Sequence, residues 1–228
     1  EYENTNIAPV FTSGASFSID ENQTVIGTVT ANDSEGDTLT FSVSGTDLSI
    51  SASGVLSFNV APDYETQSSY AATVTVTDGT NSVTQLVTIS VLDVNEVPIF
   101  TSLSSFNVDE NQTDVGIVSA TDPEGDTLTF SVSGSDLSIT STGELTFVSL
   151  PDYETQSSYS ATVTVVDGSN TTNQSITVTL IDINEAPVFT SLSSFSVVEN
   201  QTSVGRVQAT DPEGSDLTFS TAGTEISV

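Results

Sequence analysis

The nine residues Ser158-Tyr-Ser-Ala-Thr-Val-Thr-Val-Val166 decide the fold class, because polar and apolar side chains alternate along them. In an extended chain, successive side chains point to opposite faces. One face of this segment therefore carries Tyr159, Val163 and Val165, whereas the other carries serine and threonine side chains. The pattern predicts an antiparallel strand that buries its apolar face and exposes its threonine-rich face to solvent.

Similar runs of Val, Ile, Phe and Thr lie on either side of this segment, separated by Gly, Asn, Asp, Ser and Pro clusters that mark turns. Between them the runs predict seven strands, at 104–109, 114–121, 127–133, 137–140, 144–148, 158–166 and 173–182. A tight turn is expected at Ser141-Thr142-Gly143. No segment has the period of an amphipathic helix, so we expect an all-β domain.

The same sequence recurs along the chain at a constant spacing. Segments 11–45, 100–134 and 189–223 are near copies, and each begins 89 residues after the previous one. A unit of this length, with its own strands and turns, is larger than a solenoid repeat and close in size to an immunoglobulin-like sandwich. The sequence therefore predicts tandem seven-stranded Greek-key β-sandwich domains of the cadherin and immunoglobulin type, joined end to end.

Short acidic linkers separate the copies at 93–98 and 182–187, and each ends in a proline that restricts the backbone. The predicted domains are repeat 1 at 1–97, repeat 2 at 98–186 and the incomplete repeat 3 at 187–228. By the repeat spacing, Val228 falls in the fourth strand of repeat 3. We expect the array to continue beyond Val228, with strand donation by a neighbouring chain as the alternative.

The composition excludes several classes of function. The chain has 31 acidic residues and one basic residue, Arg206, with a formal net charge of −30. This charge repels nucleic acids and anionic lipids, so neither is an expected partner. His, Cys and Lys are absent, which excludes Ser/His and Cys/His catalytic pairs, Schiff-base lysines and thiolate or imidazole metal sites. No apolar run is long enough to span a bilayer. We therefore expect a protein that is not an enzyme and does not insert this part into a membrane.

The acidic residues recur at strand ends and in the linkers, at equivalent positions of each copy. Two like charges about 4 Å apart repel by roughly 1 kcal/mol in water and by about 4 kcal/mol at an effective dielectric of 20. Such a cluster requires a cation if it is to stay together. Calcium accepts six to eight oxygen ligands from separate loops, whereas magnesium requires stricter geometry. The sequence predicts calcium sites where the copies meet.

Four motifs resemble those of the cadherin family, in particular its bacterial cadherin-like repeats, and they occur in the same order in successive copies. They are Asp-Glu-Asn at 20–22 and 109–111 with Val-Glu-Asn at 198–200, Asp-Tyr-Glu at 63–65 and 152–154, Asp-Ser-Glu-Gly-Asp at 33–37 with Asp-Pro-Glu-Gly-Asp at 122–126, and the linkers. They resemble the family's x-Glu-Asn, Asp-Arg-Glu, Asp-x-Asp and Asp-x-Asn-Asp-Asn sequences. The resemblance covers nearly the whole chain.

The resemblance implies up to three calcium ions at each junction. By it, the first two ions of the first junction would be held by Glu21, Asp63, Glu65, Asp93, Glu96 and Glu124. The third would be held by Asp122, Glu124, Asp167 and the Asn95 carbonyl. The second junction would repeat this arrangement with Glu110, Asp152, Glu154, Asp182, Asn184, Glu185, Asp211 and Glu213.

Departures from the family pattern make the sites unequal. The linkers are one residue short and have Glu for the second Asp, and the counterpart of Asp167 in repeat 3 lies beyond Val228. We expect fewer or weaker ions at the second junction. In repeat 1, Asp33, Glu35 and Asp78 face segment 4–6, which has no acidic residue. Calcium is therefore expected mainly between repeats 1 and 2.

Other interpretations of the same residues remain open. Surface acids are often merely solvated, and Asp63 with Glu65 could form a glycosidase pair, although no aromatic cleft accompanies them. A carbohydrate-binding module is a better alternative, since polar loops can bind sugars through calcium, although Trp is absent. The Asn-Gln-Thr sequences at 22, 111 and 200 fit the N-glycosylation pattern, but they coincide with the calcium motif.

The expected function is that of an extracellular spacer or adhesion module of a secreted or surface protein. Calcium would stiffen the junctions, and extracellular calcium would fill sites with dissociation constants of about 10⁻⁴ to 10⁻³ M. The expected partners are calcium, other copies or neighbouring repeats, and a cell-surface or polysaccharide ligand. The alternative is a carbohydrate-binding accessory module of a polysaccharide-degrading protein.

Overall fold

The computed structural model describes residues 6–222 and divides into two compact units, 1–96 and 97–228. Each unit is described by itself. The described residues form strands, turns and loops without a helix, which confirms the predicted all-β class. The expectations for Asn4, Thr5 and the strand ending at Val228 fall outside the described residues.

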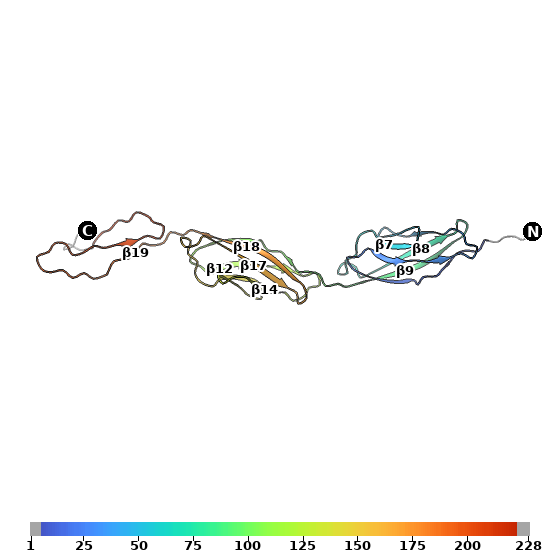
Figure 1. The fold of residues 1–228 in the computed structure, drawn as a ribbon, viewed down its shortest axis with the longest axis horizontal. Helices are drawn as coiled ribbons and strands as arrows, with labels where there is room; N and C mark the ends of the chain where they lie inside the picture. The colour runs from blue at the N-terminus through green and yellow to red at the C-terminus, as the bar shows by residue number, and fades with distance from the viewer. Residues whose placement is uncertain (1–5, 223–228) are drawn as a thin grey trace, which may run out of the picture. The chain divides into compact units, whose positions relative to one another are not determined.

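The described residues of unit 1 form nine strands. They are β1 (Val10–Phe11), β2 (Ser16–Asp20), β3 (Val25–Thr28), β4 (Ala31–Asn32), β5 (Thr40–Val43), β6 (Leu48–Ile50), β7 (Val55–Phe58), β8 (Ser69–Thr77) and β9 (Ser82–Leu92). One sheet has the order β2-β9-β8-β5 and the other β3-β7-β6, while β1 pairs with β4. Figure 1 shows β8 and β9, the longest strands, running side by side. The two sheets form the predicted sandwich.

The core of unit 1 follows from the alternation along its strands. In the C-terminal parts of β8 and β9 every second side chain is buried. Val74, Val87 and Ile89 there are almost fully inaccessible to solvent. Leu56 of the other sheet lies in the same apolar cluster. Full burial of one such aliphatic side chain contributes about 1.5–3 kcal/mol, so the inner faces of the two sheets hold the unit together.

Unit 2 repeats this architecture in its first part. Its strands there are β10 (Ile99–Phe100), β11 (Ser105–Asp109), β12 (Asp114–Ile117), β13 (Ala120–Thr121), β14 (Thr129–Val132), β15 (Leu137–Ile139), β16 (Glu144–Phe147), β17 (Ser158–Val166) and β18 (Thr171–Ile181). The sheet orders are β11-β18-β17-β14 and β12-β16-β15. The predicted buried face of β17 is confirmed, since Val163 and Val165 are fully buried in the core.

The structure differs from the prediction near the start of this repeat. The single strand expected at 114–121 is divided into β12, which pairs with β16, and β13, which pairs with the unpredicted β10. The division occurs at Val118, whose amide donates to the Gly143 carbonyl at 2.9 Å, whereas Ser119 accepts from Thr101 at 2.8 Å. The chain therefore leaves one pairing partner for another within two residues, which alternation alone does not reveal.

The tight turn expected at Ser141-Thr142-Gly143 is present between β15 and β16. Gly143 has φ +84°, and a Cβ atom there would lie 2.0 Å from the Val118 carbonyl oxygen. Only glycine has no side chain to clash at this distance. The turn at Gly143 and the segment between β12 and β13 therefore contact each other closely through their backbones.

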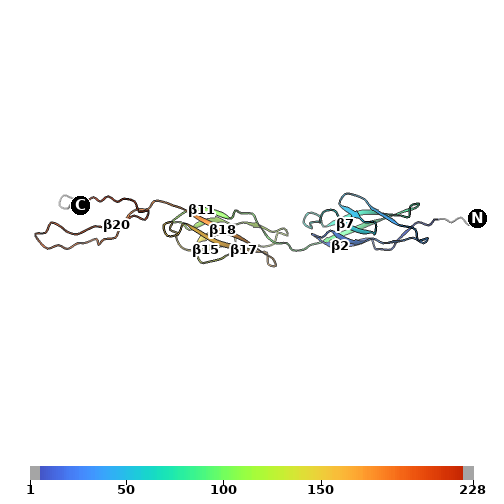
Figure 2. The ribbon, with the colours of Figure 1, turned by 45° about the horizontal axis from the view of Figure 1, so that its top comes forward.

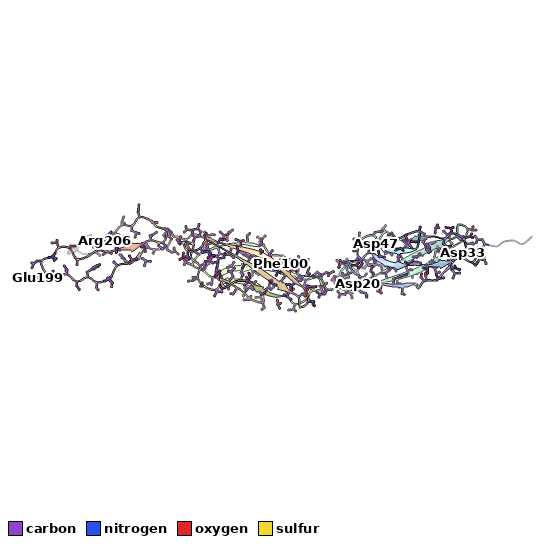
Figure 3. All side chains as sticks on the ribbon, in the orientation of Figure 1. Asp20, Asp33, Asp47, Phe100, Glu199 and Arg206 are labelled. Atoms are coloured by element: carbon purple, nitrogen blue, oxygen red, sulfur yellow. The ribbon has the colours of Figure 1, made fainter. Side chains whose placement is uncertain are left out.

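The loops that carry the acidic motifs lie near the ends of the sandwich in unit 1. Figure 3 shows Asp20, which ends β2, and Asp33, which follows β4, near opposite ends of the unit. Beside Asp20, the Glu21 amide donates to the Leu92 carbonyl at 3.0 Å, which joins the end of β2 to the end of β9. Each complete repeat therefore carries acidic loops at both of its ends.

The third copy, in the last part of unit 2, contains the strand pair β19 (Val188–Phe189) and β20 (Ala209–Thr210) among its described residues. Figure 2 shows β20 in this part, whereas the sheet strands β11, β17 and β18 lie in the preceding repeat. Phe189 and Leu192 are exposed here. Within residues 6–222, no helix is long and apolar enough to cross a membrane.

Candidate metal centre

Glu21 connects three loops at one end of unit 1. It is 2% exposed, and its carboxylate accepts hydrogen bonds from the Tyr64 and Val94 amides, both at 2.8 Å. Tyr64 belongs to the Asp-Tyr-Glu motif and Val94 to the linker. A buried carboxylate is tolerated when such donors satisfy it. Glu21 therefore fixes both segments against the end of β2.

Asn22 makes a parallel set of contacts to the same two segments. Its backbone amide donates to the Pro62 carbonyl at 3.0 Å, and its Nδ2 donates to Glu96 Oε1 at 2.5 Å. Its φ of 62° places it in the left-handed region. The engagement of Nδ2 supports the structural interpretation of the Asn-Gln-Thr sequence rather than the glycan-acceptor interpretation.

Three glutamates of unit 1 come together around this connection. Glu21, Glu65 and Glu96 each offer a carboxylate oxygen, and these oxygens lie within 4.8 Å of one another. The three residues come from the end of β2, from the loop between β7 and β8, and from the linker. Sites that are distant in sequence thus converge at one end of the sandwich.

Unit 2 contains a similar arrangement, with Asp182, the counterpart of Asp93, as its third member. Glu110 is 3% exposed and accepts from the Tyr153 and Ile183 amides, both at 2.8 Å. Asn111 Nδ2 donates to Glu185 Oε1. Carboxylate oxygens of Glu110, Glu154 and Asp182 lie within 4.8 Å of one another.

A second group in unit 2 joins repeat 2 to the third copy. Oxygens of Glu154, Glu185 and Glu213 lie within 4.8 Å of one another, so Glu154 belongs to both groups. The Glu185 amide donates to Glu213 Oε1 at 2.7 Å. The Oε2 atoms of Glu185 and Glu213 are buried and accept no hydrogen bond from the described residues. Buried carboxylate oxygens of this kind require a cation or protons.

The electrostatics of this group reflect the crowding. Desolvation raises the pKa of Glu154, and the charges of Glu110, Asp182 and Glu213 raise it further. The hydrogen bond from Asn111 lowers the pKa of Glu185, but desolvation and its contacts with Glu213 and Glu110 raise it overall. The carboxylates therefore destabilise one another when no positive charge lies among them.

The donor set fits calcium. All clustered atoms are oxygens, and calcium–oxygen distances of about 2.3–2.6 Å place ligand atoms on opposite sides of one ion roughly 5 Å apart. The clustered oxygens lie within 4.8 Å of one another, so they could share one ion. In such a site the ion would supply positive charge, while the hydrogen bonds to Glu21 and Glu110 hold the ligands in place.

Not every residue implied by the resemblance lies in these groups. The carboxylate of Asp63 accepts from the Thr66 amide at 3.1 Å and the Thr66 hydroxyl at 3.0 Å, and these bonds lower the pKa of Asp63. Asp152 accepts from the Thr155 amide at 2.9 Å in the same way. Both residues therefore cap their own turns.

The remaining implied residues lie in the linkers and in the turns after β13, β17 and β20. Asp93 is exposed, and Asn95 and Asn184 donate from their side chains to the carbonyls of Glu96 and Glu185 at 3.0 and 2.9 Å. The turn carboxylates accept local amides: Asp122 from Asp126, Asp167 from Ser169 and Asn170, and Asp211 from Ser215. Glu124 lies in the same turn as Asp122 and is half-buried.

Other buried oxygens of unit 1 belong to segment 4–6 and to acids that were expected to face it. Asp33 is 8% exposed, and Asp33 Oδ2, Asp78 Oδ2 and Asn6 Oδ1 are buried without a hydrogen bond from the described residues. Asn6 is held there because its carbonyl accepts from Asn81 Nδ2 at 3.1 Å. Sequence reasoning counted only acids in segment 4–6 and so missed the amide oxygen of Asn6.

The raised pKa of Glu154 predicts how the chelated protein responds to pH. Because the folded state binds its proton more tightly than the unfolded state, the free energy of unfolding falls as the pH rises above the ordinary value of 4.5. In chelator we expect a higher melting temperature at about pH 5 than at about pH 7. Calcium, which binds the ionised carboxylates, should reverse this trend.

The matched variants for this prediction are Glu154→Gln and Glu144→Gln. Glu144 is an exposed glutamate of β16 and belongs to neither group. Glu154→Gln should reduce the pH dependence, because one of the two glutamates of this group with a raised pKa is gone. An equal flattening by Glu144→Gln would mean that net charge alone causes the trend.

The family model described as Bacterial Ig domain matches residues 6–90 and 95–180. The chain is 33% identical over 188 residues to Chitinase A of Pseudoalteromonas piscicida, a match that covers 81% of this chain and 23% of the chitinase. It is also 33% identical over 206 residues to Protocadherin Fat 4 of Homo sapiens, covering 82% of this chain and 4% of the protocadherin. The chain thus spans less than a quarter of each of these relatives.

Solved cadherin structures share the fold. Mouse Cadherin-23 EC22-24 superposes with a TM-score of 0.55 at 21% identity, covering 91% of this chain and 78% of that chain. The Protocadherin GammaB4 extracellular domain superposes with a TM-score of 0.53 at 27% identity, covering 93% and 39%. These matches confirm the resemblance to cadherin-like repeats. The chain therefore belongs to the bacterial Ig domain family, and its repeats have the fold of cadherin ectodomains.

Proposed function

We propose that this chain is an extracellular spacer and adhesion module that calcium stiffens at the junctions between its repeats. The observation that carries the proposal is the group formed by Glu154, Glu185 and Glu213, because two of its carboxylate oxygens are buried without a hydrogen-bond donor. Its members come from a loop of repeat 2, the linker and the third copy. An ion bound by all three would join one repeat to the next.

The proposed division is repeat 1 at 1–97, repeat 2 at 98–186 and the start of repeat 3 at 187–228. The proposed ligands are the residues implied by the cadherin resemblance, with the gathered glutamates as the principal ones. The capped carboxylates Asp63 and Asp152 would have to bind through their remaining lone pairs or exchange their turn bonds for the ion. Asp33, Asp78 and Asn6 form an additional proposed site at the start of repeat 1.

We further propose that the chain has no catalytic role and acts outside the cell, where calcium is abundant. Each buried glutamate accepts hydrogen bonds from two backbone amides, as structural carboxylates do. The partners would be calcium, neighbouring repeats or second copies, and a cell-surface ligand.

Calorimetric titration of the full chain with calcium tests the site. We expect more than one ion per chain, with dissociation constants on the order of 10⁻⁴ to 10⁻³ M. Magnesium should bind more weakly, because the ligands come from separate loops that do not impose octahedral geometry. The absence of binding heat and of any change in melting temperature in millimolar calcium would reject the proposal.

A second candidate function is a carbohydrate-binding accessory module. The similarity to Chitinase A favours it, as does a hollow of about 340 Å³ in unit 1, lined among others by Asp47, Asn59 and Tyr70. Tyr70 packs against Phe58 with ring centroids 4.7 Å apart, and both aromatic residues line the hollow. Polar groups beside a partly exposed ring can bind a sugar.

Sedimentation with insoluble chitin, with and without calcium, separates the two functions. A carbohydrate-binding module should be depleted from solution by chitin, and Asn59→Val should abolish this depletion. Val148 stands at the equivalent position of repeat 2, so the variant imitates the second copy. A chain that stays in solution on chitin but binds calcium supports the spacer function.

A further inference from the structure

We propose that Asn22 and Asn111 are positioning residues that orient the linker glutamates Glu96 and Glu185 for calcium. The inference rests on the proposed calcium sites and adds to them a pair of side chains that need not contact the ion. Each asparagine directly follows the buried glutamate of its repeat, and each donates its side-chain amide to the carboxylate of the linker glutamate.

The orientation of these glutamates requires an explanation, because they lie in linkers. A glutamate side chain loses most of its rotational freedom when it is held in one rotamer. The Asn22 amide already holds Glu96 Oε1 at 2.5 Å, beside Glu21 and Glu65. A ligand that is oriented before the metal arrives loses less freedom on binding, so the amide strengthens the site.

The backbone of each asparagine is adapted to this contact. Asn22, Asn111 and Asn200 have φ values of 62°, 61° and 65°, in the left-handed region that asparagine tolerates better than most residues with a side chain. The amides of Asn22 and Asn111 donate to Pro62 and Pro151, both at 3.0 Å. The same residue therefore turns the chain after the buried glutamate and directs its side chain toward the linker.

Two simpler roles make different predictions. If the position requires only a left-handed backbone, glycine should serve as well as asparagine. If the asparagine oxygen is itself a calcium ligand, aspartate should bind the ion at least as tightly, because a carboxylate is the stronger ligand. If the side-chain amide orients the glutamate, both substitutions should weaken calcium binding. Neither glycine nor aspartate has a side chain that donates a hydrogen bond to the glutamate, and aspartate also repels Glu96.

The test uses the full chain with the double variants Asn22→Gly/Asn111→Gly and Asn22→Asp/Asn111→Asp, titrated with calcium in a calorimeter. We expect each to bind calcium about ten-fold more weakly than the native chain. The midpoint of urea unfolding in chelator should stay near the native value for the glycine variant, because its backbone conformation is retained. Asn200→Gly is the matched control, since Asn200 has the same left-handed backbone, with φ 65°, and makes no hydrogen bond to a linker glutamate among the described residues.

A second arm asks whether Asn22 acts through Glu96. In a Glu96→Ala background, Asn22→Gly should cause no further loss of calcium affinity, so the two losses should not add. Additive losses, undiminished binding by the glycine variant, or tighter binding by the aspartate variant would each overturn the inference. If the native chain binds no calcium, the proposed function fails first; if it binds and the variants bind equally, only the positioning role fails.

Discussion

Removal of calcium should lower the melting temperature of this chain by about 10 °C or more. A ligand at 100 times its dissociation constant stabilises the folded state by about 2.7 kcal/mol per site, and 10 mM calcium reaches that ratio for a site of about 10⁻⁴ M. For a domain of this size, about 1 kcal/mol corresponds to roughly 4–8 °C. Differential scanning calorimetry in calcium and in chelator measures the difference.

The control for this prediction is an equal ionic strength of sodium chloride. Screening alone weakens repulsion among the acidic residues, since the Debye length is about 10 Å at 0.1 M salt. Sodium should therefore recover only part of the stability. Full recovery by sodium would show that bulk screening, and not a bound divalent ion, stabilises the folded repeats.

Glu21→Ala should destabilise unit 1 by about 3 kcal/mol even in chelator, because the Tyr64 and Val94 amides lose the acceptor that the buried Glu21 provides. Glu110→Ala should have the same effect on unit 2. Both variants should also lose calcium binding at their own site. Urea unfolding followed by hydrogen exchange of the peptides around residues 64 and 94 measures the loss and locates it.

Asp20→Ala provides the matched control, because Asp20 is the exposed neighbour of Glu21 at the end of β2. Removing the Asp20 carboxylate leaves both hydrogen bonds from backbone amides to Glu21 in place. It changes the net charge by the same amount as Glu21→Ala does. We expect little change in the urea midpoint. Equal losses in the two variants would mean that Glu21 contributes only its charge and not its hydrogen bonds.

Much of the fold could be predicted from the sequence because strand alternation repeats in each copy. β17 and β18 are long and largely alternating, and the predicted strand at 158–166 matches β17. The two-residue strands β10 and β13 carry no such pattern. Their pairing depends on where Val118 and Gly143 meet, which is a tertiary contact, and so it could not be predicted.

The candidate site divides in a similar way. Repetition and strand ends predict that Glu21, Glu65 and Glu96 lie in loops at one end of the sandwich, because strands of a sandwich end together. Spacing does not tell which way a side chain turns within its loop. Asp63, two residues before Glu65, accepts a hydrogen bond from Thr66 in its own turn. Asn22 instead donates from its side chain to Glu96 in the linker. Both depend on local rotamers and turn geometry rather than on residue type.

Small-angle X-ray scattering of the full chain, with calcium and with chelator, tests the claim of a calcium-stiffened spacer most directly. Without calcium, no ion bridges the crowded carboxylates of a junction. The repeats should then sample many relative orientations. We therefore predict that the chain in calcium gives the larger maximum dimension and the scattering of a single extended shape, and that chelator shortens the mean dimension and broadens the distribution. Identical scattering profiles in the two conditions would contradict the account.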